Sequence, residues 1–315
     1  MRSDAIRPRK WVLLLCELRA PFFTASAVPV MLGTALAFYD TGTCDWVLFG
    51  LALAGVVLIH GGSNVANDYF DHRSGNDEAN TEYVRPFTGG SRMIQRGLLT
   101  PGEVLGLAVA CFALALMPGA YLTYRGGWPI PALAAIGALG GFFYSAPPVS
   151  LAARGLGEGV VALNFGVLPV VGAYFLQTGR ISWDAAAFSL PVAVLVLAIL
   201  FINQFQDMNA DRAVGKRNWV VRLGRRASSR IYAVLLVAWA VPILWGAAAG
   251  RLPLHTLLAV MPLALAVPAI ARTWRAYDEP ARLAPANALT VLVHLSAGVL
   301  FTAGLVWAGR GGGQT

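Results

Sequence analysis

The chain has 315 residues, of which 57% are hydrophobic and only 13% are charged, whereas about a quarter of the residues in ordinary soluble domains are charged. Because so few polar residues cannot cover a globular core of this size, the composition excludes an ordinary soluble fold and indicates a membrane protein. The formal net charge of +8 does not indicate a nucleic-acid partner, since a basic excess on one membrane face is the usual result of topology.

The apolar residues gather into nine blocks of about 17 to 25 residues, the length with which a helix crosses the hydrocarbon core of a bilayer. In chain order the blocks cover residues 22–38, 46–65, 104–123, 130–145, 160–176, 185–205, 231–249, 254–270 and 288–307. The fourth block is short and rich in glycine, which favours close packing against its neighbours. We therefore predict an all-α integral membrane protein, a single polytopic domain over residues 1–315 with nine transmembrane helices.

The basic residues predict the orientation of this domain. Four of them within residues 2–10 precede a short apolar run, which Glu17 and Arg19 interrupt too early for a signal peptide. If this N-terminal tail is cytoplasmic, nineteen of the 24 Lys and Arg residues lie on the cytoplasmic side and only four on the other. We expect a multi-pass protein of the cell's inner (cytoplasmic) membrane, with its N-terminus in the cytoplasm and its C-terminus on the opposite side.

Two connections between the predicted spans, residues 67–102 and 207–230, are long and polar and fall on the cytoplasmic side, as functional loops do. Both open in the same way, because Asn64 stands four residues before Asp68 and Asn203 four before Asp207, at an offset of 139 residues. The match predicts two pseudo-repeat halves, approximately 11–145 and 146–275, to which a ninth helix at 288–307 is added.

Five aspartates in these two Asp-rich loops form the candidate site. Asp68, Asp71 and Asp77 belong to the first loop, and Asp207 and Asp211 to the second. Because carboxylates that converge at one membrane face repel one another, they need a multivalent cation that bridges them to an anionic substrate. Oxygen ligands without a His or Cys cluster favour a hard ion, so we predict that all five bind Mg2+ and that the substrate carries a diphosphate. The alternative is that these carboxylates are solvated or paired with neighbouring arginines.

Polar and basic residues beside the aspartates are candidates for substrate contact. Lys216, Arg85 and Arg92 lie in the same two loops, where they are expected to neutralise the charge that builds on a departing diphosphate. Two further groups complete the predicted substrate site: the asparagines that share helical faces with the aspartates, and an arginine near the first membrane interface. These residues are Asn64, Asn67, Asn203 and Arg19.

The two acidic segments resemble the motifs of the UbiA superfamily of intramembrane prenyltransferases. The first reads NDxxDxxxxxD from Asn67 to Asp77, and the second reads DxxxDxxxGKR from Asp207 to Arg217. The resemblance implies a helical bundle around a central cavity that opens sideways to lipid. It also implies a Mg2+-dependent enzyme that transfers a polyprenyl group from a polyprenyl diphosphate to an aromatic acceptor within the bilayer.

Within that superfamily the chain is most similar to the MenA branch, the 1,4-dihydroxy-2-naphthoate polyprenyltransferases of menaquinone biosynthesis. The similarity lies in residues 144–148, which read YSAPP, and in residues 154–158, which read RGLGE. Tyr144, at the end of a span, is expected to shield the allylic cation or orient the acceptor hydroxyl, with an interfacial anchor as its alternative role. Arg154, the one basic residue of its cytoplasmic loop, is expected to attract an acidic acceptor, with an ordinary positive-inside residue as the alternative. Residues 83–92 and 218–219 depart from the branch. A 4-hydroxybenzoate, homogentisate or non-quinone ring therefore remains an alternative acceptor.

A cation transporter is the alternative from another class of function. Such a protein would carry acidic residues in the middle of several spans, where they would form an ion path. Here the carboxylates concentrate at one membrane face, and the third, eighth and ninth predicted spans are almost free of them. The distribution therefore favours the transferase.

Overall fold

The computed structural model describes residues 9–311, and within them it contains helices, turns and loops but no strand. Arg2 and Arg7 of the predicted basic tail lie outside the described residues. The helices are α1 (Lys10–Glu17), η1 (Ala20–Phe23), α2 (Thr24–Thr41), α3 (Trp46–Arg73), α4 (Asn76–Ala79), α5 (Pro101–Gly126), α6 (Pro129–Phe142), η2 (Leu151–Arg154), α7 (Gly157–Ala162), η3 (Leu163–Val167), α8 (Leu168–Thr178), α9 (Trp183–Ala213), α10 (Trp219–Leu223), α11 (Arg225–Ala238), α12 (Val241–Ala248), η4 (Leu254–Val260), α13 (Leu263–Ala276), η5 (Pro280–Leu283) and α14 (Ala284–Gly311).

The prediction of an all-helical, multi-span protein is confirmed, but the number of nine spans is not. In the described part of the chain, eight helical segments are long and apolar enough to cross a membrane. The fourth predicted span forms α6, which has only 14 residues. At about 1.5 Å per residue, α6 is about 21 Å long and so falls short of a hydrocarbon core of about 30 Å.

Polar caps and glycine turns set the ends of the long helices. The Asp45 carboxylate accepts hydrogen bonds from the backbone N–H groups of Val47 and Leu48 and so begins α3. Thr100 and Glu103 form a capping box at the start of α5. Gly42 ends α2 with a φ of 70°, a conformation that glycine adopts without steric cost.

Prolines divide two of the predicted spans. The fifth predicted span is built from α7, the single π-helical turn η3 and α8, and Pro169 stands in the first turn of α8. The seventh is built from α11 and α12, with Pro242 in the first turn of α12. Proline lacks an N–H donor and crowds the preceding turn, so it begins a helix more readily than it continues one.

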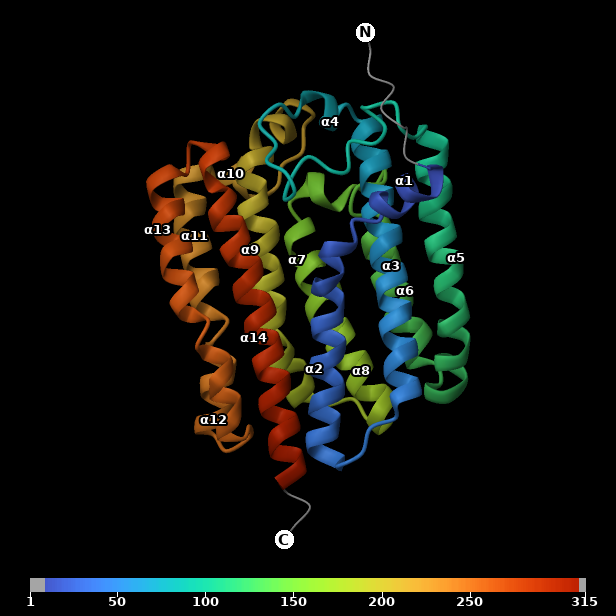
Figure 1. The fold of residues 1–315 in the computed structure, drawn as a ribbon, viewed down its shortest axis with the longest axis vertical. Helices are drawn as coiled ribbons and strands as arrows, with labels where there is room; N and C mark the ends of the chain where they lie inside the picture. The colour runs from blue at the N-terminus through green and yellow to red at the C-terminus, as the bar shows by residue number, and fades with distance from the viewer. Residues whose placement is uncertain (1–8, 312–315) are drawn as a thin grey trace.

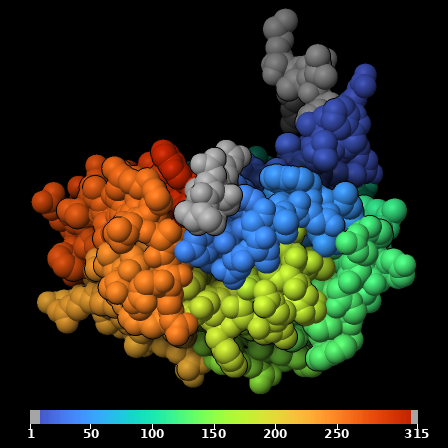
Figure 2. All heavy atoms as spheres, turned by 90° about the horizontal axis from the view of Figure 1, so that it is seen from below, coloured from blue at the N-terminus to red at the C-terminus, as the bar shows by residue number. Residues whose placement is uncertain are grey.

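The helices pack into a bundle that is closed at one end by the segment between α3 and α5 (Figure 1). This segment contains α4 and lies over the ends of α3 and α9. The first described residues of α1 lie at the same end, whereas α14 finishes at the other. Seen from that opposite end, the turns between α2 and α3 and between α8 and α9 lie beside one another (Figure 2).

The main hydrophobic core lies on the side of the bundle formed by α2, α9 and the helices that follow α9. Its largest fully buried side chains include Trp239, Tyr232, Phe201 and Phe301. The helices α3, α5 and α6 contribute smaller clusters. This difference leaves room for a cavity beside α3, α5 and α6. The pseudo-repeat of the two halves stays a prediction.

Candidate functional site

Four of the five predicted aspartates lie at the ends of two long helices rather than in loops. Asp68 and Asp71 occupy the last two turns of α3, which runs two turns beyond the predicted apolar span. Asp207 and Asp211 occupy the last two turns of α9 in the same way. A long helix tolerates polar residues once it has left the apolar core, so α3 and α9 continue beyond the predicted apolar spans, which end at 65 and 205.

Lys216 brings the two acidic motifs together. Its Nζ atom lies 2.5 Å from Asp71 Oδ1 and 3.8 Å from Asp211 Oδ1. Gly215, with a φ of 79°, turns the chain back at the end of α9, and the Lys216 N–H donates to the Asp211 carbonyl. Although burial opposes the charged form, the carboxylates of Asp71 and Asp211 raise the pKa of the Lys216 ammonium above its usual value. The ammonium group is therefore protonated at neutral pH.

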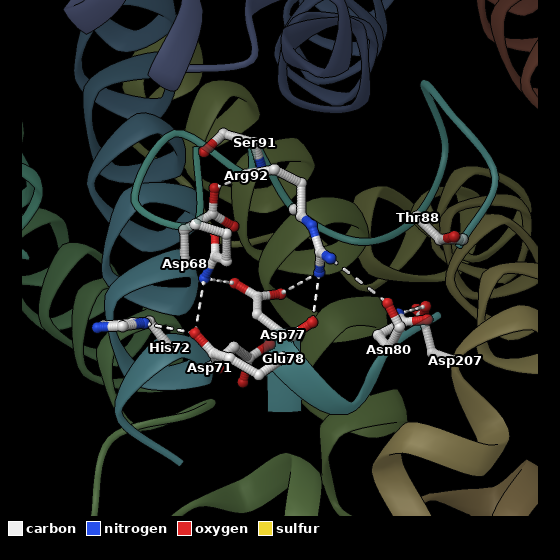
Figure 3. A network of polar contacts seen from close by, with 12 residues as sticks. Asp68, Asp71, His72, Asp77, Glu78, Asn80, Thr88, Ser91, Arg92 and Asp207 are labelled. Atoms are coloured by element: carbon white, nitrogen blue, oxygen red, sulfur yellow. Dashed lines mark hydrogen bonds and ion pairs between the residues drawn. The ribbon is translucent and has the colours of Figure 1, made fainter. Parts of the chain in front are cut away.

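The short helix α4 carries the fifth aspartate, Asp77, onto the same end of the bundle (Figure 3). The Arg92 guanidinium donates to the backbone carbonyl of Asp77, and Gln95 Nε2 donates to its carboxylate at 2.9 Å. Burial, together with the nearby carboxylates of Asp71 and Asp68, raises the pKa of Asp77 to about 8. This carboxyl group therefore holds a proton at neutral pH unless a cation displaces it.

Asp68 is buried beneath residues 90–92 (Figure 3). Its Oδ2 atom accepts the backbone N–H of Ser91 at 2.8 Å, and Arg19 Nη1 lies 3.6 Å from its Oδ1. Gly90, with a φ of 63°, passes so close to this carboxylate that a Cβ atom would meet Asp68 Oδ1 at 2.8 Å. Asp68 thus holds in place the segment between α3 and α5, residues 74–100, which we call the covering segment.

The remaining predicted residues fall into two groups. Asn67 belongs to the site, because its Nδ2 atom donates to Asp71 at 3.2 Å and to Ser145 at 2.6 Å. Tyr144 precedes that serine, and its ring packs against Gly157, where a Cβ atom would meet Tyr144 Cε2 at 2.9 Å. Asn64 lies one turn before Asp68 on α3 and has a buried Nδ2 atom without a partner.

Three of the residues predicted to contact substrate form hydrogen bonds outside the cluster of aspartates, and their role stays a prediction. The Asn203 carbonyl oxygen accepts from Asn287 of α14 at 2.7 Å. Arg85 donates to the backbone carbonyls of residues 90 and 91, so it braces the covering segment. Arg154 is exposed and donates to the carbonyl of Pro148 at 2.9 Å. None of the three contacts an aspartate of the site.

Several buried polar residues at this end of the bundle were not among the predicted site residues. Glu17 is fully buried near Asp68 without a hydrogen-bond partner, and Glu158 accepts the backbone N–H of Trp219 at 2.7 Å. Asn76 begins α4 and Asn80 follows its last residue, and both face the aspartates of the second motif. Both asparagines lie beside Asp77 in the sequence, but only the three-dimensional path of residues 74–80 brings them to α9.

The donor set suits Mg2+ bound together with an anionic substrate. Among the described residues, no group of three or more His, Cys, Asp or Glu side chains is arranged as a complete metal site. The aspartates are paired instead with Lys216, Arg19 and amide groups. Magnesium needs only one or two carboxylates when phosphate oxygens and waters supply the rest of its shell. The carboxylate oxygens and the unpartnered amide oxygens at this end of the bundle are hard ligands of that kind.

An apolar cavity lies next to this polar end. The cavity, including its opening, has a volume of about 870 Å³. It is surrounded by α2, α3, α5, α6, η3 and α8. Its wall includes Ile59, His60 and Ser63 of α3, so it ends about one turn before Asn67. The His60 ring is held by Ser26 Oγ, 2.8 Å from its Nδ1 atom. The cavity is therefore enclosed by helices from both predicted halves, with its wall formed by residues between 30 and 176.

Comparison with known proteins gives three concordant results. The sequence matches the model of the UbiA prenyltransferase family over residues 26–295. It is 29% identical to the 2-carboxy-1,4-naphthoquinone phytyltransferase of Synechocystis sp., over 98% of this chain and 97% of that protein. It is 28% identical to the 1,4-dihydroxy-2-naphthoate octaprenyltransferase of Bacillus subtilis, over 74% of this chain and 72% of that protein.

A solved structure shares the fold. The UbiA homolog from Archaeoglobus fulgidus bound to GPP and Mg2+ superposes with a TM-score of 0.63, covering 92% of this chain and 99% of that chain at 14% sequence identity. The expected bundle architecture is therefore confirmed.

Proposed function

Because the chain belongs to the UbiA prenyltransferase family, we propose that it transfers the prenyl group of a polyprenyl diphosphate to a 1,4-dihydroxy-2-naphthoate acceptor in menaquinone or phylloquinone biosynthesis. One observation carries this proposal: Lys216 lies between Asp71 and Asp211 and joins the two acidic motifs at the end of an apolar cavity. The names of the Synechocystis and Bacillus subtilis relatives support a naphthoate ring as the acceptor.

The donor diphosphate is proposed to bind among the five aspartates. Magnesium, when bound there, supplies positive charge that stabilises the departing diphosphate. Asp68, Asp71, Asp77, Asp207 and Asp211 are the proposed ligands. Lys216 and Arg19 already lie within 4 Å of these carboxylates, so each can turn from an aspartate to a phosphate oxygen. Arg92 donates to the backbone carbonyl of Asp77 and so holds α4 in place.

The prenyl chain is proposed to extend from the aspartates into the cavity beside α3. Ile59 and Ser63 line the cavity, and Asn67 and Asp71 follow on the next two turns of the same helix. A molecule with an anionic head and an apolar tail matches this change from polar to apolar wall.

Tyr144 and Ser145 lie where the two substrates would meet, because Asn67 joins Ser145 to Asp71. In the proposed reaction the bond between the allylic carbon and the diphosphate oxygen breaks, and its electron pair leaves with the diphosphate. The allylic carbon bonds to the acceptor ring, whose carboxylate is lost as CO2. The Tyr144 ring face is suited to shield the positive charge on the allylic carbon.

The experiment that tests this function uses purified protein in lipid nanodiscs with labelled geranylgeranyl diphosphate and Mg2+. Matched concentrations of 1,4-dihydroxy-2-naphthoate, 4-hydroxybenzoate and homogentisate are offered as acceptors. We expect the naphthoate to be prenylated at least tenfold faster than either other ring. Faster prenylation of 4-hydroxybenzoate or homogentisate would contradict the acceptor, and no prenylation of any ring would contradict the proposed activity.

A further inference from the structure

Two asparagines of the first acidic segment lie against the aspartates of the second. Asn80 Nδ2 donates to Asp207 Oδ1 at 2.6 Å (Figure 3). The side chain of Asn76 faces the carboxylate of Asp211. Both asparagines are at least nine-tenths buried, with exposed fractions of 5% for Asn76 and 4% for Asn80. Helix α4 and the residue that follows it therefore connect the two motifs through neutral amide groups. Lys216 connects the same two motifs through a positive charge.

The carboxylate of Asp207 fixes which way the Asn80 amide points. A carboxylate accepts hydrogen bonds and does not donate them when ionised, so the amide NH2 group must face it. The amide oxygen then points away from Asp207. This Asn80 Oδ1 atom is buried without a hydrogen-bond partner, and the same is true of Asn76 Oδ1. Buried acceptors of this kind require a donor or a cation.

The rest of the covering segment holds these amides in position. The Arg92 guanidinium donates to the backbone carbonyl of Asp77 and, at 3.5 Å, to that of Asn80. The same guanidinium lies 4.4 Å from the centre of the Tyr83 ring. Arg92, which belongs to neither motif, therefore fixes the position of α4. The unpartnered oxygens of Asn76 and Asn80 thus lie on a segment that is held in place.

We propose that Asn76 and Asn80 are part of the cation site, with their amide oxygens as neutral ligands, direct or through water, beside Asp211 and Asp207. This inference rests on the proposed function in that the cation is the one that binds the diphosphate. Amide oxygens are hard ligands that suit Mg2+. They add ligands without adding negative charge to a site that already holds five carboxyl groups.

The test measures Mn2+ binding, so it does not depend on turnover. The full chain is purified in detergent and titrated with Mn2+, and the free ion is followed by electron paramagnetic resonance with and without inorganic pyrophosphate. We expect Asn80→Ala and Asn76→Ala each to raise the dissociation constant for Mn2+ about tenfold or more. The matched control is Asn209→Ala, because Asn209 is exposed, lies two residues after Asp207 and donates to Glu82. It should leave the constant within about twofold of the unmodified chain.

Circular dichroism and gel filtration show whether each variant is folded, and Asn76→Ala carries the test if Asn80→Ala unfolds. Unchanged Mn2+ binding in both folded variants, or no Mn2+ binding by the unmodified chain in either condition, would overturn the inference. Failure of the proposed function would appear separately, as normal Mn2+ binding without prenyl transfer to any acceptor.

Discussion

Lys216 Nζ lies 2.5 Å from Asp71 Oδ1 and so connects the end of α9 to the end of α3, across 145 residues of sequence. Both side chains are about 15% exposed, so bulk water screens the two charges only weakly.

The first prediction follows from this pair. Lys216→Met removes the cation and leaves Asp71 buried without it, which is expected to lower the free energy of unfolding by about 3 kcal/mol. It should also lower kcat by about 100-fold, because a positive charge aimed at the leaving group is lost. Thermal unfolding and single-turnover kinetics measure the two effects. Lys10→Met is the control, since Lys10 is exposed and pairs with Glu103. Equal turnover in the two variants would remove Lys216 from the mechanism.

The second prediction concerns the aspartates as metal ligands. Asp68→Asn, Asp71→Asn, Asp207→Asn and Asp211→Asn should each reduce turnover about 100-fold or more while the protein stays folded, because each removes a charged ligand. EDTA should abolish activity, and added Mg2+ should restore it. Asp184→Asn is the control, because Asp184 pairs with Arg251 and both side chains are about half exposed. Full activity in chelator would contradict the metal-dependent mechanism.

The third prediction is a pH dependence that arises from Asp77. Its pKa is raised from 3.8 to about 8, so below pH 8 a cation must displace a proton to bind this carboxylate. The half-saturating Mg2+ concentration should therefore fall as the pH rises from about 6.5 to 8.5. Without metal, the folded state holds this proton more tightly than the unfolded state. The stability of the metal-free protein should then decrease as the pH rises from about 4 to 8.

Asp77→Asn tests that assignment, since it removes the titrating group and keeps its size. The slope of Mg2+ affinity against pH should become shallower in this variant. An unchanged slope would assign the pH dependence to another group.

The fourth prediction concerns the cavity. Gly137 lines it, and a Cβ atom at this position would meet nothing within 4 Å, so Gly137→Leu fills empty space without a clash at its first carbon. If the prenyl chain occupies this cavity, kcat/KM for geranylgeranyl diphosphate should fall at least tenfold more than that for dimethylallyl diphosphate. Gly106→Leu is the control, because Gly106 is exposed on α5, outside the cavity, and has equal room. Equal losses for both donors would place the prenyl chain elsewhere.

The fifth prediction concerns orientation in the membrane. Ser74 is exposed at the end of the bundle that holds the aspartates, and Cys44 lies in the turn between α2 and α3 at the other end. In cells, an impermeant maleimide should label Cys44 from outside. A Ser74→Cys variant that lacks the native cysteines should react only after lysis. Labelling of both from the same side would contradict the proposed topology.

The apolar spans and the two acidic motifs could be predicted from the sequence because both are local patterns. The convergence of Asp71 and Asp211 on Lys216 was expected only in outline, since it depends on how α3 and α9 pack. The path of residues 74–92 could not be predicted, because it is set by contacts between distant residues. Ser91 binds Asp68, Arg92 holds α4, and Asn80 reaches Asp207. Such contacts leave no periodic signal in the sequence.

The short helix α6 also has a consequence for the surrounding lipid. Gly141 of α6 lies against Ser63 of α3, with no space between them for a side chain on Gly141. Helix α6 therefore ends near the level of Ser63. Helix α3 continues for ten more residues, or about 15 Å. This hydrophobic mismatch favours a locally thinner bilayer beside α6. Tyr144 follows two residues after the end of α6, so in such a thinner bilayer it would come close to the headgroup layer, in which an amphiphilic ring with a carboxylate partitions. An acceptor dissolved in that layer would reach Tyr144 by lateral diffusion, without crossing the acyl-chain region.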